Sequence, residues 1–255
     1  MSGTGARSGT PARAARTTRN LLVGWTLALL VIALFARLGF WQLDRAEQKR
    51  ETLMAAAQAL EPGRVVSLAA AADAARKDSY DWALGTGRFA PTGPLLLDNQ
   101  QRGGSSGVRA YRVFEPAQGP ALLVDLGWLP LGGARELPEV ERPQGDLELR
   151  GLLAPPPSAG LAMGAPMARV EQGWLMTRVE SAAIVEALGL DGPLAPRVLR
   201  LDPALRLGYE RDLDVLPNTL TPDKHRGYAL QWFGLAIALL VIALVLTFRR
   251  FDHER

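Results

Sequence analysis

Apolar residues gather in two long blocks, one near each end of the chain. The first runs without a charged residue from Leu21 to Ala36 and continues, after Arg37, to Leu43. The second, Tyr228–Phe248, holds 21 residues without a charge. At about 1.5 Å per helical residue, such a block spans the roughly 30 Å hydrocarbon core of a bilayer. The pattern therefore predicts two transmembrane helices, over residues 21–43 and 223–248.

Each block has a simpler alternative interpretation. A basic region precedes the first block, as in a cleaved signal peptide, but Leu34 occupies the −3 position of the candidate cleavage site and Trp41 lies where an interfacial anchor belongs. These residues favour a retained helix. The second block resembles a buried helix of a soluble domain, but nothing else in the chain could surround a helix that is apolar on every side.

Positive charges beside the blocks predict their orientation. Residues 1–20 carry four arginines and no acid, and residues 249–255 carry three basic and two acidic residues. Residues 37–227 carry 22 basic and 24 acidic residues. Because cytoplasmic flanks of membrane helices are rich in Lys and Arg, both termini are expected in the cytoplasm, as basic tails 1–20 and 249–255, with the region between the helices outside. The net charge of +3 thus reflects topology and gives no reason to expect nucleic-acid binding.

The region between the blocks changes character near residue 80. Residues 44–60 are rich in good helix formers and end before Pro62 and Gly63, and a second short helix is expected over 68–77, so residues 44–80 are interpreted as a helical stalk. Residues 81–222 contain short apolar runs separated by Gly and Pro, which predict strands at 82–84, 95–97, 108–114, 121–126, 147–152 and 197–201.

Three further patterns complete this domain. Alternation of apolar and polar residues in 147–152 predicts a sheet with one face in water. Residues 103–107 predict a hairpin loop, and 179–188 predict a helix stopped by Gly189. The expected fold is an α+β membrane protein in which two transmembrane helices flank one antiparallel, β-rich periplasmic domain.

Composition excludes much chemistry. The chain has no cysteine and only two histidines, His225 and His253, so sulfur-based metal sites and multi-histidine sites cannot form. A phosphate loop, a dinucleotide-binding fingerprint and a G-x-S-x-G motif are all missing from the sequence. A membrane-bound hydrolase is therefore the least favoured of the alternative functions.

His225 lies where the domain is expected to re-enter the membrane. On a helix, Tyr228 and Trp232 share its face, which places an imidazole above an aromatic strip. A neutral imidazole can ligate haem iron, and Arg226 or Arg37 could pair with the propionates. The alternative is an interfacial histidine and an aromatic belt that only anchor the helix, and the residue types leave both interpretations open.

Small residues offer faces on which the two membrane helices could pair closely. They are Gly24 with Ala28, and Gly234 with Ala238. If the helices pair, four predicted site residues meet at the outer membrane boundary: Arg37, Trp41, His225 and Arg226.

An ordered set of motifs along most of the chain resembles one known family. The motifs are residues 38–45 with Lys49, then 87–89, 97–99, 107–116 and 123–130, and finally His225-x-x-Tyr228-Ala229-x-x-Trp232-Phe233-Gly234. The chain resembles the surfeit-locus cytochrome c oxidase biogenesis proteins of bacteria and mitochondria. One departure is Leu126, which stands where the family often has arginine, so a polar role is in doubt there.

The resemblance implies a non-enzymatic assembly factor, or chaperone, of the bacterial inner membrane. It implies binding of haem a and its delivery to subunit I of a haem-copper terminal oxidase, with haem a synthase as a further partner besides membrane lipid. It assigns His225 as an axial ligand of haem iron, with Trp232 as the corresponding tryptophan of the same helix. The alternative is a haem-independent scaffold that stabilises oxidase subunits.

Overall fold

The chain divides into two compact units. One combines the chain up to Glu51 with the chain from Thr219 onward, and the other runs between them. The computed structural model describes residues 11–160, 164–216 and 219–253. Residues 1–10 and 254–255 of the two predicted tails lie outside the described residues.

Two long helices form the first unit, α1 (Pro11–Ala59) and α3 (Pro222–His253). The predicted membrane helix and the first part of the predicted stalk are one continuous helix, which ends just before Pro62, a residue that cannot continue it. Within the described residues, both helices are long and apolar enough to cross a membrane. Their most apolar segments are almost unburied within the protein, so this apolar surface needs a covering from outside the chain.

The second unit is built on a nine-stranded sheet. Its strands are β1 (Val65–Ser67), β2 (Asp81–Phe89), β3 (Leu95–Arg102), β4 (Ser105–Pro116), β5 (Leu122–Pro130), β6 (Leu147–Ala154), β7 (Met167–Val170), β8 (Gly173–Met176) and β9 (Val198–Leu201). Strands β2, β6, β9, β5 and β4 pair in that order, and β4 pairs again with β2, which closes them into a small barrel. All six predicted strands are confirmed.

Apolar side chains on the two faces of these strands make two cores. The main core lies inside the closed ring and includes Phe89, Phe114 and Leu149, with Leu68 entering from a short 3₁₀ helix. The second core lies on the other face, where α2 (Ser181–Leu188) buries Ile184. Closure of the barrel thus buries the inner face of these strands, and the second core covers part of the outer face.

The sheet is mixed, so the expectation of an antiparallel sheet is wrong in part. Three pairs are parallel: β1 with β2, β3 with β8 and β5 with β9. Helix α2 connects β8 to β9 and carries the chain across the sheet, so both strands run in the direction of β3 and β5.

The turn and the helix end that were predicted from a few neighbouring residues are found in the structure. The hairpin predicted at 103–107 is confirmed, but its loop is shorter than expected, because β4 begins at Ser105 and only Gly103 and Gly104, both with positive φ, form the turn. Gly189 ends α2 in the left-handed conformation, as predicted. The short helix expected over 68–77 is instead two 3₁₀ helices, Leu68–Ala72 and Ala74–Arg76, because the side chain of Asp73 caps the second and interrupts the first. A third 3₁₀ helix spans Gly133–Arg135.

Buried ion pairs fasten the barrel strands together. Arg197 is fully buried, and its Nη1 lies 2.6 Å from Oδ2 of Asp81. Arg109 on β4 lies 2.7 Å from Asp125 on β5. Leu126 is 1% exposed and packs in the main core, so the position where the family often has arginine has an apolar role in this chain.

Candidate functional site

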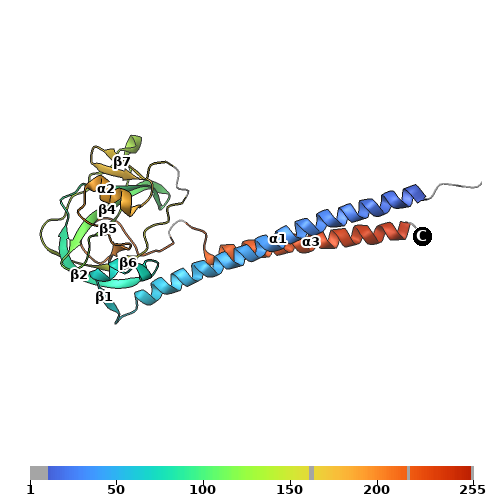
Figure 1. Ribbon diagram of the computed structural model, residues 1–255, viewed down its shortest axis with the longest axis horizontal. Coiled ribbons are helices and arrows are strands. Elements are labelled where there is room, and N and C mark those ends of the chain that lie inside the picture. Colours follow the sequence, from blue (N-terminus) through green and yellow to red (C-terminus); the bar gives the residue numbers. More distant parts are fainter. Residues whose placement is uncertain (1–10, 161–163, 217–218, 254–255) are drawn as a thin grey trace, which may run out of the picture. The chain divides into compact units, whose positions relative to one another are not determined.

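Helices α1 and α3 lie side by side in opposite directions (Figure 1). Trp25 contacts Thr247, Phe35 contacts Trp232, Gln42 contacts His225 and Lys49 contacts Leu220. Residue numbers fall along α3 as they rise along α1. The pair therefore has two chemically different ends, one near Trp25 and one near His225.

Gly39 packs directly against the side chain of Phe233 on the other helix. A Cβ atom built on Gly39 would lie 2.6 Å from Cε1 of Phe233, which is too close for any side chain. The Phe233 ring packs edge-on against Phe40 with centroids 5.2 Å apart. Gly24 and Gly234, by contrast, have open space where a Cβ would be. The small faces expected at those two glycines therefore do not form the close contact.

His225 is buried in this interface and hydrogen-bonded to Gln42. Its Nδ1 lies 2.6 Å from Oε1 of Gln42, and the two residues are 5% and 9% exposed. Because an amide oxygen only accepts hydrogen bonds, Nδ1 carries the proton and Nε2 holds the free lone pair. No described residue bonds to Nε2, which is buried. The imidazole is thus in the tautomer that a metal ligand requires, with the ligating nitrogen unused.

Positive charge surrounds this imidazole. Lys49 is 8% exposed, its Nζ donates a hydrogen bond of 2.5 Å to the carbonyl oxygen of Leu220, and no carboxylate pairs with it among the described residues. Lys49 and Arg45 both act electrostatically on His225. A buried ammonium group held only by a carbonyl can accept a carboxylate or phosphate partner.

The other predicted site residues lie around this pair. Trp232 is half-buried, with its ring centroid 5.6 Å from that of Phe35. Tyr228 and Trp41 are exposed, at 41% and 54%. The interface face of α3 therefore runs through His225 and Trp232, and Tyr228 lies outside it.

The two predicted arginines are both exposed. Arg226 makes a contact of 3.3 Å with Asp223 on its own helix. Arg37 makes no ion pair or hydrogen bond with the rest of the described chain. The buried cation near His225 is therefore Lys49, and neither Arg37 nor Arg226 is buried there.

Gln42 and Lys49 are absent from the residues predicted for the site. A signal for Gln42 exists, because it is a polar side chain between Trp41 and Leu43 at the end of an apolar block, and polar residues in membrane helices mark functional positions. No sequence signal shows that Lys49 reaches residue 220.

A closed metal site cannot form here. Within residues 11–160, 164–216 and 219–253, no three histidine, aspartate or glutamate side chains cluster in a way that could hold a metal ion. His225 can offer one nitrogen ligand, and any further ligands must come with the bound group.

Comparison with known proteins identifies the family. The model of the SURF1 family matches residues 29–237, which include both Gln42 and His225. The chain belongs to the SURF1 family. This confirms the resemblance inferred from the ordered motifs.

Two curated relatives carry the same family name. The SURF1-like protein of Rickettsia conorii is 27% identical over 233 residues, which cover 89% of this chain and 90% of the relative. The SURF1-like protein of Rickettsia felis is 27% identical over 234 residues, covering 89% of this chain and 95% of the relative. The SURF1 family is known in general as a family of oxidase assembly factors rather than as an enzyme class.

Proposed function

We propose that this SURF1 family protein is an inner-membrane assembly factor that binds haem a through His225 and assists its insertion into subunit I of a haem-copper oxidase. The proposal adds to the family's general role a ligand, a binding residue and a recipient. When bound, haem supplies iron that an imidazole can ligate, so the chemistry of the protein is binding and release.

One observation carries the haem assignment. The imidazole of His225 is held by Gln42 in the tautomer with a free Nε2, and that atom is buried without a partner. A buried polar atom without a hydrogen bond costs about 1–3 kcal/mol, and such atoms in native proteins call for an explanation. A ligand that coordinates Nε2 would supply one.

The surroundings fit a haem in other respects. Lys49 is a buried cation without a carboxylate partner, and exposed Arg37 and Arg226 lie on the same two helices, so all three are candidates to pair with propionates. Trp232 lies on the same face of α3 as His225 and offers an aromatic surface there. A single protein ligand suits handover, because a second ligand would strengthen retention.

Both helices are proposed to cross the inner membrane with the termini in the cytoplasm and the β-rich unit in the periplasm. The exposed leucines of the two helices, such as Leu30 at 63% and Leu230 at 75%, support this, because lipid would cover them. The arginine-rich flanks of both helices support the orientation.

The test is an absorption spectrum with pigment extraction, on detergent-purified protein co-expressed with the enzymes that make haem a. Wild type is expected to carry stoichiometric haem a, and His225→Ala to lose most of it. Gln231→Leu, which changes an exposed residue of α3, is the matched control and should keep the pigment. Equal haem a in the wild type and in His225→Ala would refute the assignment of His225.

One observation favours the alternative, a scaffold that grips oxidase subunits without haem. Nε2 of His225 is buried, so iron reaches it only if the side chains that cover it move. A scaffold would be colourless in the same co-expression and would still co-purify with subunit I. Co-purification of haem a synthase with the pigmented protein would instead support a carrier that receives haem from its source.

A further inference from the structure

Lys49 is a buried cation of the helix pair with unused hydrogen-bond donors. The residue is 8% exposed, and its Nζ donates one hydrogen bond of 2.5 Å, to the carbonyl oxygen of Leu220 just before α3. An ammonium group carries three N–H donors, so the described residues leave two of them without an acceptor. Lys49 can therefore bind an anion and keep its bond to Leu220.

Acidic residues of the neighbouring turns do not supply that anion. Glu47 and Asp223 each pair with an arginine three positions later on their own helix, at 3.8 Å and 3.3 Å. Asp44 and Glu51 are exposed and lie five positions before and two positions after Lys49, so on a helix they point away from it. Among the described residues, no carboxylate forms an ion pair with Lys49. The anion must therefore come from a bound group.

Lys49 lies on the face of α1 that contacts His225. Gln42, the hydrogen-bond partner of His225, is seven positions before Lys49, and seven residues bring a helix back almost to the same side. Along the helix axis the two residues are about 10 Å apart. The iron of a haem lies at the centre of the macrocycle and its two propionates extend from one edge. A haem ligated by His225 could thus direct a carboxylate toward Lys49.

The exposed arginines are less suited to this contact. Arg226 already pairs with Asp223, and Arg37 is exposed and lies on the opposite side of Gln42 from Lys49 along α1. Ion pairs between exposed side chains contribute little, whereas a pair that includes a buried cation is screened less by salt and water. Lys49 is therefore the strongest candidate to bind a carboxylate.

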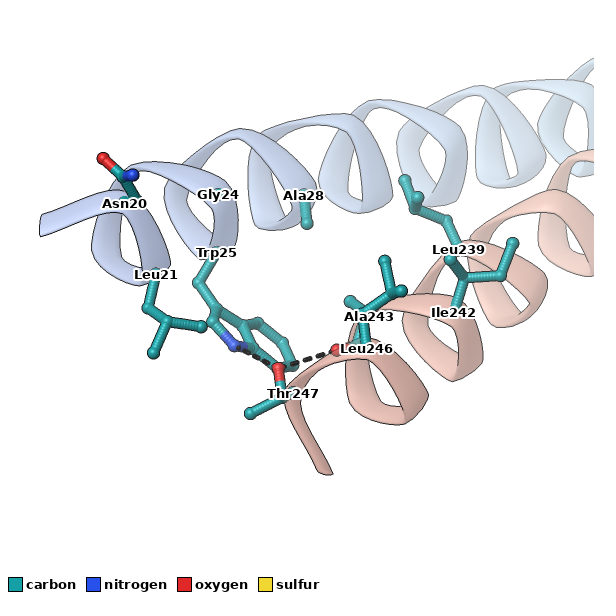
Figure 2. Close-up of a pocket in the computed structure, with 10 residues that line it drawn as sticks. All are labelled: Asn20, Leu21, Gly24, Trp25, Ala28, Leu239, Ile242, Ala243, Leu246 and Thr247. Carbon is teal, nitrogen blue, oxygen red and sulfur yellow. Dashed lines mark hydrogen bonds between the residues drawn. The ribbon is translucent and has the colours of Figure 1, made fainter. Parts of the chain in front are cut away.

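The opposite end of the helix pair offers no such group. Figure 2 shows a hollow of about 270 Å³ between α1 and α3 at that end, and none of the ten residues that line it is charged. The indole nitrogen of Trp25 donates a hydrogen bond of 3.1 Å to Oγ1 of Thr247, which donates in turn to the carbonyl oxygen of Ala243. The polar groups there are bonded to the protein itself, which leaves apolar wall.

We propose that Lys49 binds a propionate carboxylate of the haem that His225 ligates. Lys49 is then a positioning residue, because it fixes which edge of the macrocycle points along α1 toward residue 49, and it selects a ligand with an acidic edge. The inference rests on the proposed function and adds a second contact to the site.

Titration of the detergent-purified full chain with two ligands tests Lys49. The ligands are haem a and haem a in which both propionates are methyl esters. The ester cannot form the charged pair, so wild type is expected to bind it about ten-fold or more weakly than haem a. Lys49→Met keeps a long side chain without the charge and should bind the two ligands with nearly equal affinity. Lys224→Met removes an exposed lysine next to His225 and should keep the wild-type preference.

The outcomes separate this inference from the proposed function. Equal affinities of wild type for the two ligands would overturn the inference, as expected if Lys49 binds another anion such as a lipid phosphate. An unchanged preference in Lys49→Met, or an equal loss of preference in Lys224→Met, would also overturn it. Unchanged affinity for haem a in His225→Ala would overturn the proposed function, and absence of haem a binding by wild type would overturn both.

Discussion

Replacing Gln42 by leucine should weaken haem binding without removing the iron ligand. Leucine is close to glutamine in size but offers no acceptor to Nδ1 of His225, which is 2.6 Å from Oε1 in the native protein. The imidazole then either keeps an unbonded Nδ1–H or moves its proton to Nε2. In the second state no lone pair faces the ligand.

The burial of Gln42 and His225 determines how large the effect of Gln42→Leu should be. Gln42 and His225 are 9% and 5% exposed, so water does not readily replace the lost acceptor. An unsatisfied buried Nδ1–H destabilises the variant with and without haem, so by itself it leaves the affinity unchanged. Loss of an outer partner of a ligating histidine typically lowers affinity by about 10–100-fold, which is the loss expected here.

The assay is a titration of detergent-purified protein with haem, followed by absorption, for the wild type and four variants: Gln42→Leu, Gln42→Glu, His225→Ala and Gln231→Leu. Gln42→Glu keeps an oxygen acceptor and adds negative charge, so it should keep binding and lower the reduction potential of the bound haem. Gln231→Leu changes an exposed glutamine of α3 and should bind as wild type.

Wild-type affinity in Gln42→Leu, together with lost binding in His225→Ala, would refute the tautomer argument and leave the ligand assignment standing. A wild-type spectrum in His225→Ala would refute both. A shift of potential in Gln42→Glu that His225→Ala abolishes would connect the two residues.

Three further predictions concern stability and packing. Asp81→Ala leaves fully buried Arg197 without its carboxylate and should destabilise the β-rich unit by about 3–5 kcal/mol in thermal melts of the full chain. Tyr111→Phe removes a fully buried hydroxyl that has no hydrogen-bond partner among the described residues, so the free energy of unfolding near neutral pH should be equal or higher. Burial raises the pKa of Tyr111, so above about pH 10 the tyrosine ionises in the unfolded state but not in the folded state, and the free energy of unfolding of the wild type falls as the pH rises. The free energy of unfolding of Tyr111→Phe should fall less steeply over the same pH range. Gly39→Ala places a Cβ against Phe233 and should cost about 1–3 kcal/mol of helix pairing, measured as slower disulfide formation between cysteines introduced in α1 and α3.

The predictions for Asp81→Ala and Gly39→Ala each have a matched control. Glu115→Ala breaks an exposed pair with Arg88 and should cost no more than about 1 kcal/mol, so equal losses for Glu115→Ala and Asp81→Ala would contradict the burial argument. If the free energy of unfolding of Tyr111→Phe falls above about pH 10 as steeply as that of the wild type, the effect does not come from ionisation of Tyr111. Gly24→Ala meets no atom within 4 Å and should leave cross-linking unchanged.

Most of the helices and strands could be predicted from local patterns in the sequence. The strand runs, the Gly103–Gly104 turn and the Gly189 helix stop were predictable because each depends on a few neighbouring residues. The parallel pairing of β5 with β9 and the closure of β4 on β2 were not, because pairing partners far apart in sequence leave no periodic signal in either strand. The prediction of close packing at Gly24 and Gly234 was wrong for a related reason. The rotation of each helix about its axis decides which glycine contacts the other helix, and that glycine is Gly39.

The candidate site also contains one part that was predictable from the sequence and one part that was not. His225 was predictable from its position at a membrane boundary and from the family motif, whereas its bond to Gln42 joins residues 183 positions apart. Lys49 shows the same limit, because its contact with Leu220 is to a backbone carbonyl and leaves no trace in residue type. Only the pairing of α1 with α3 brings these groups together.

The geometry of this pair explains how a site with one ligand can both bind and release. Burying His225 beside Gln42 satisfies Nδ1 but leaves Nε2 without a partner, at a cost of about 1–3 kcal/mol that the closed helix pair bears. In the proposed haem complex, a ligand on Nε2 would recover that cost but would first have to displace the side chains that cover the atom. The Gly39–Phe233 contact and the Lys49–Leu220 bond hold the helices on both sides of this point, so access is expected to depend on side-chain movement while the pair stays together. Delivery of haem to an oxidase, as proposed above, would require that binding at this site is reversible.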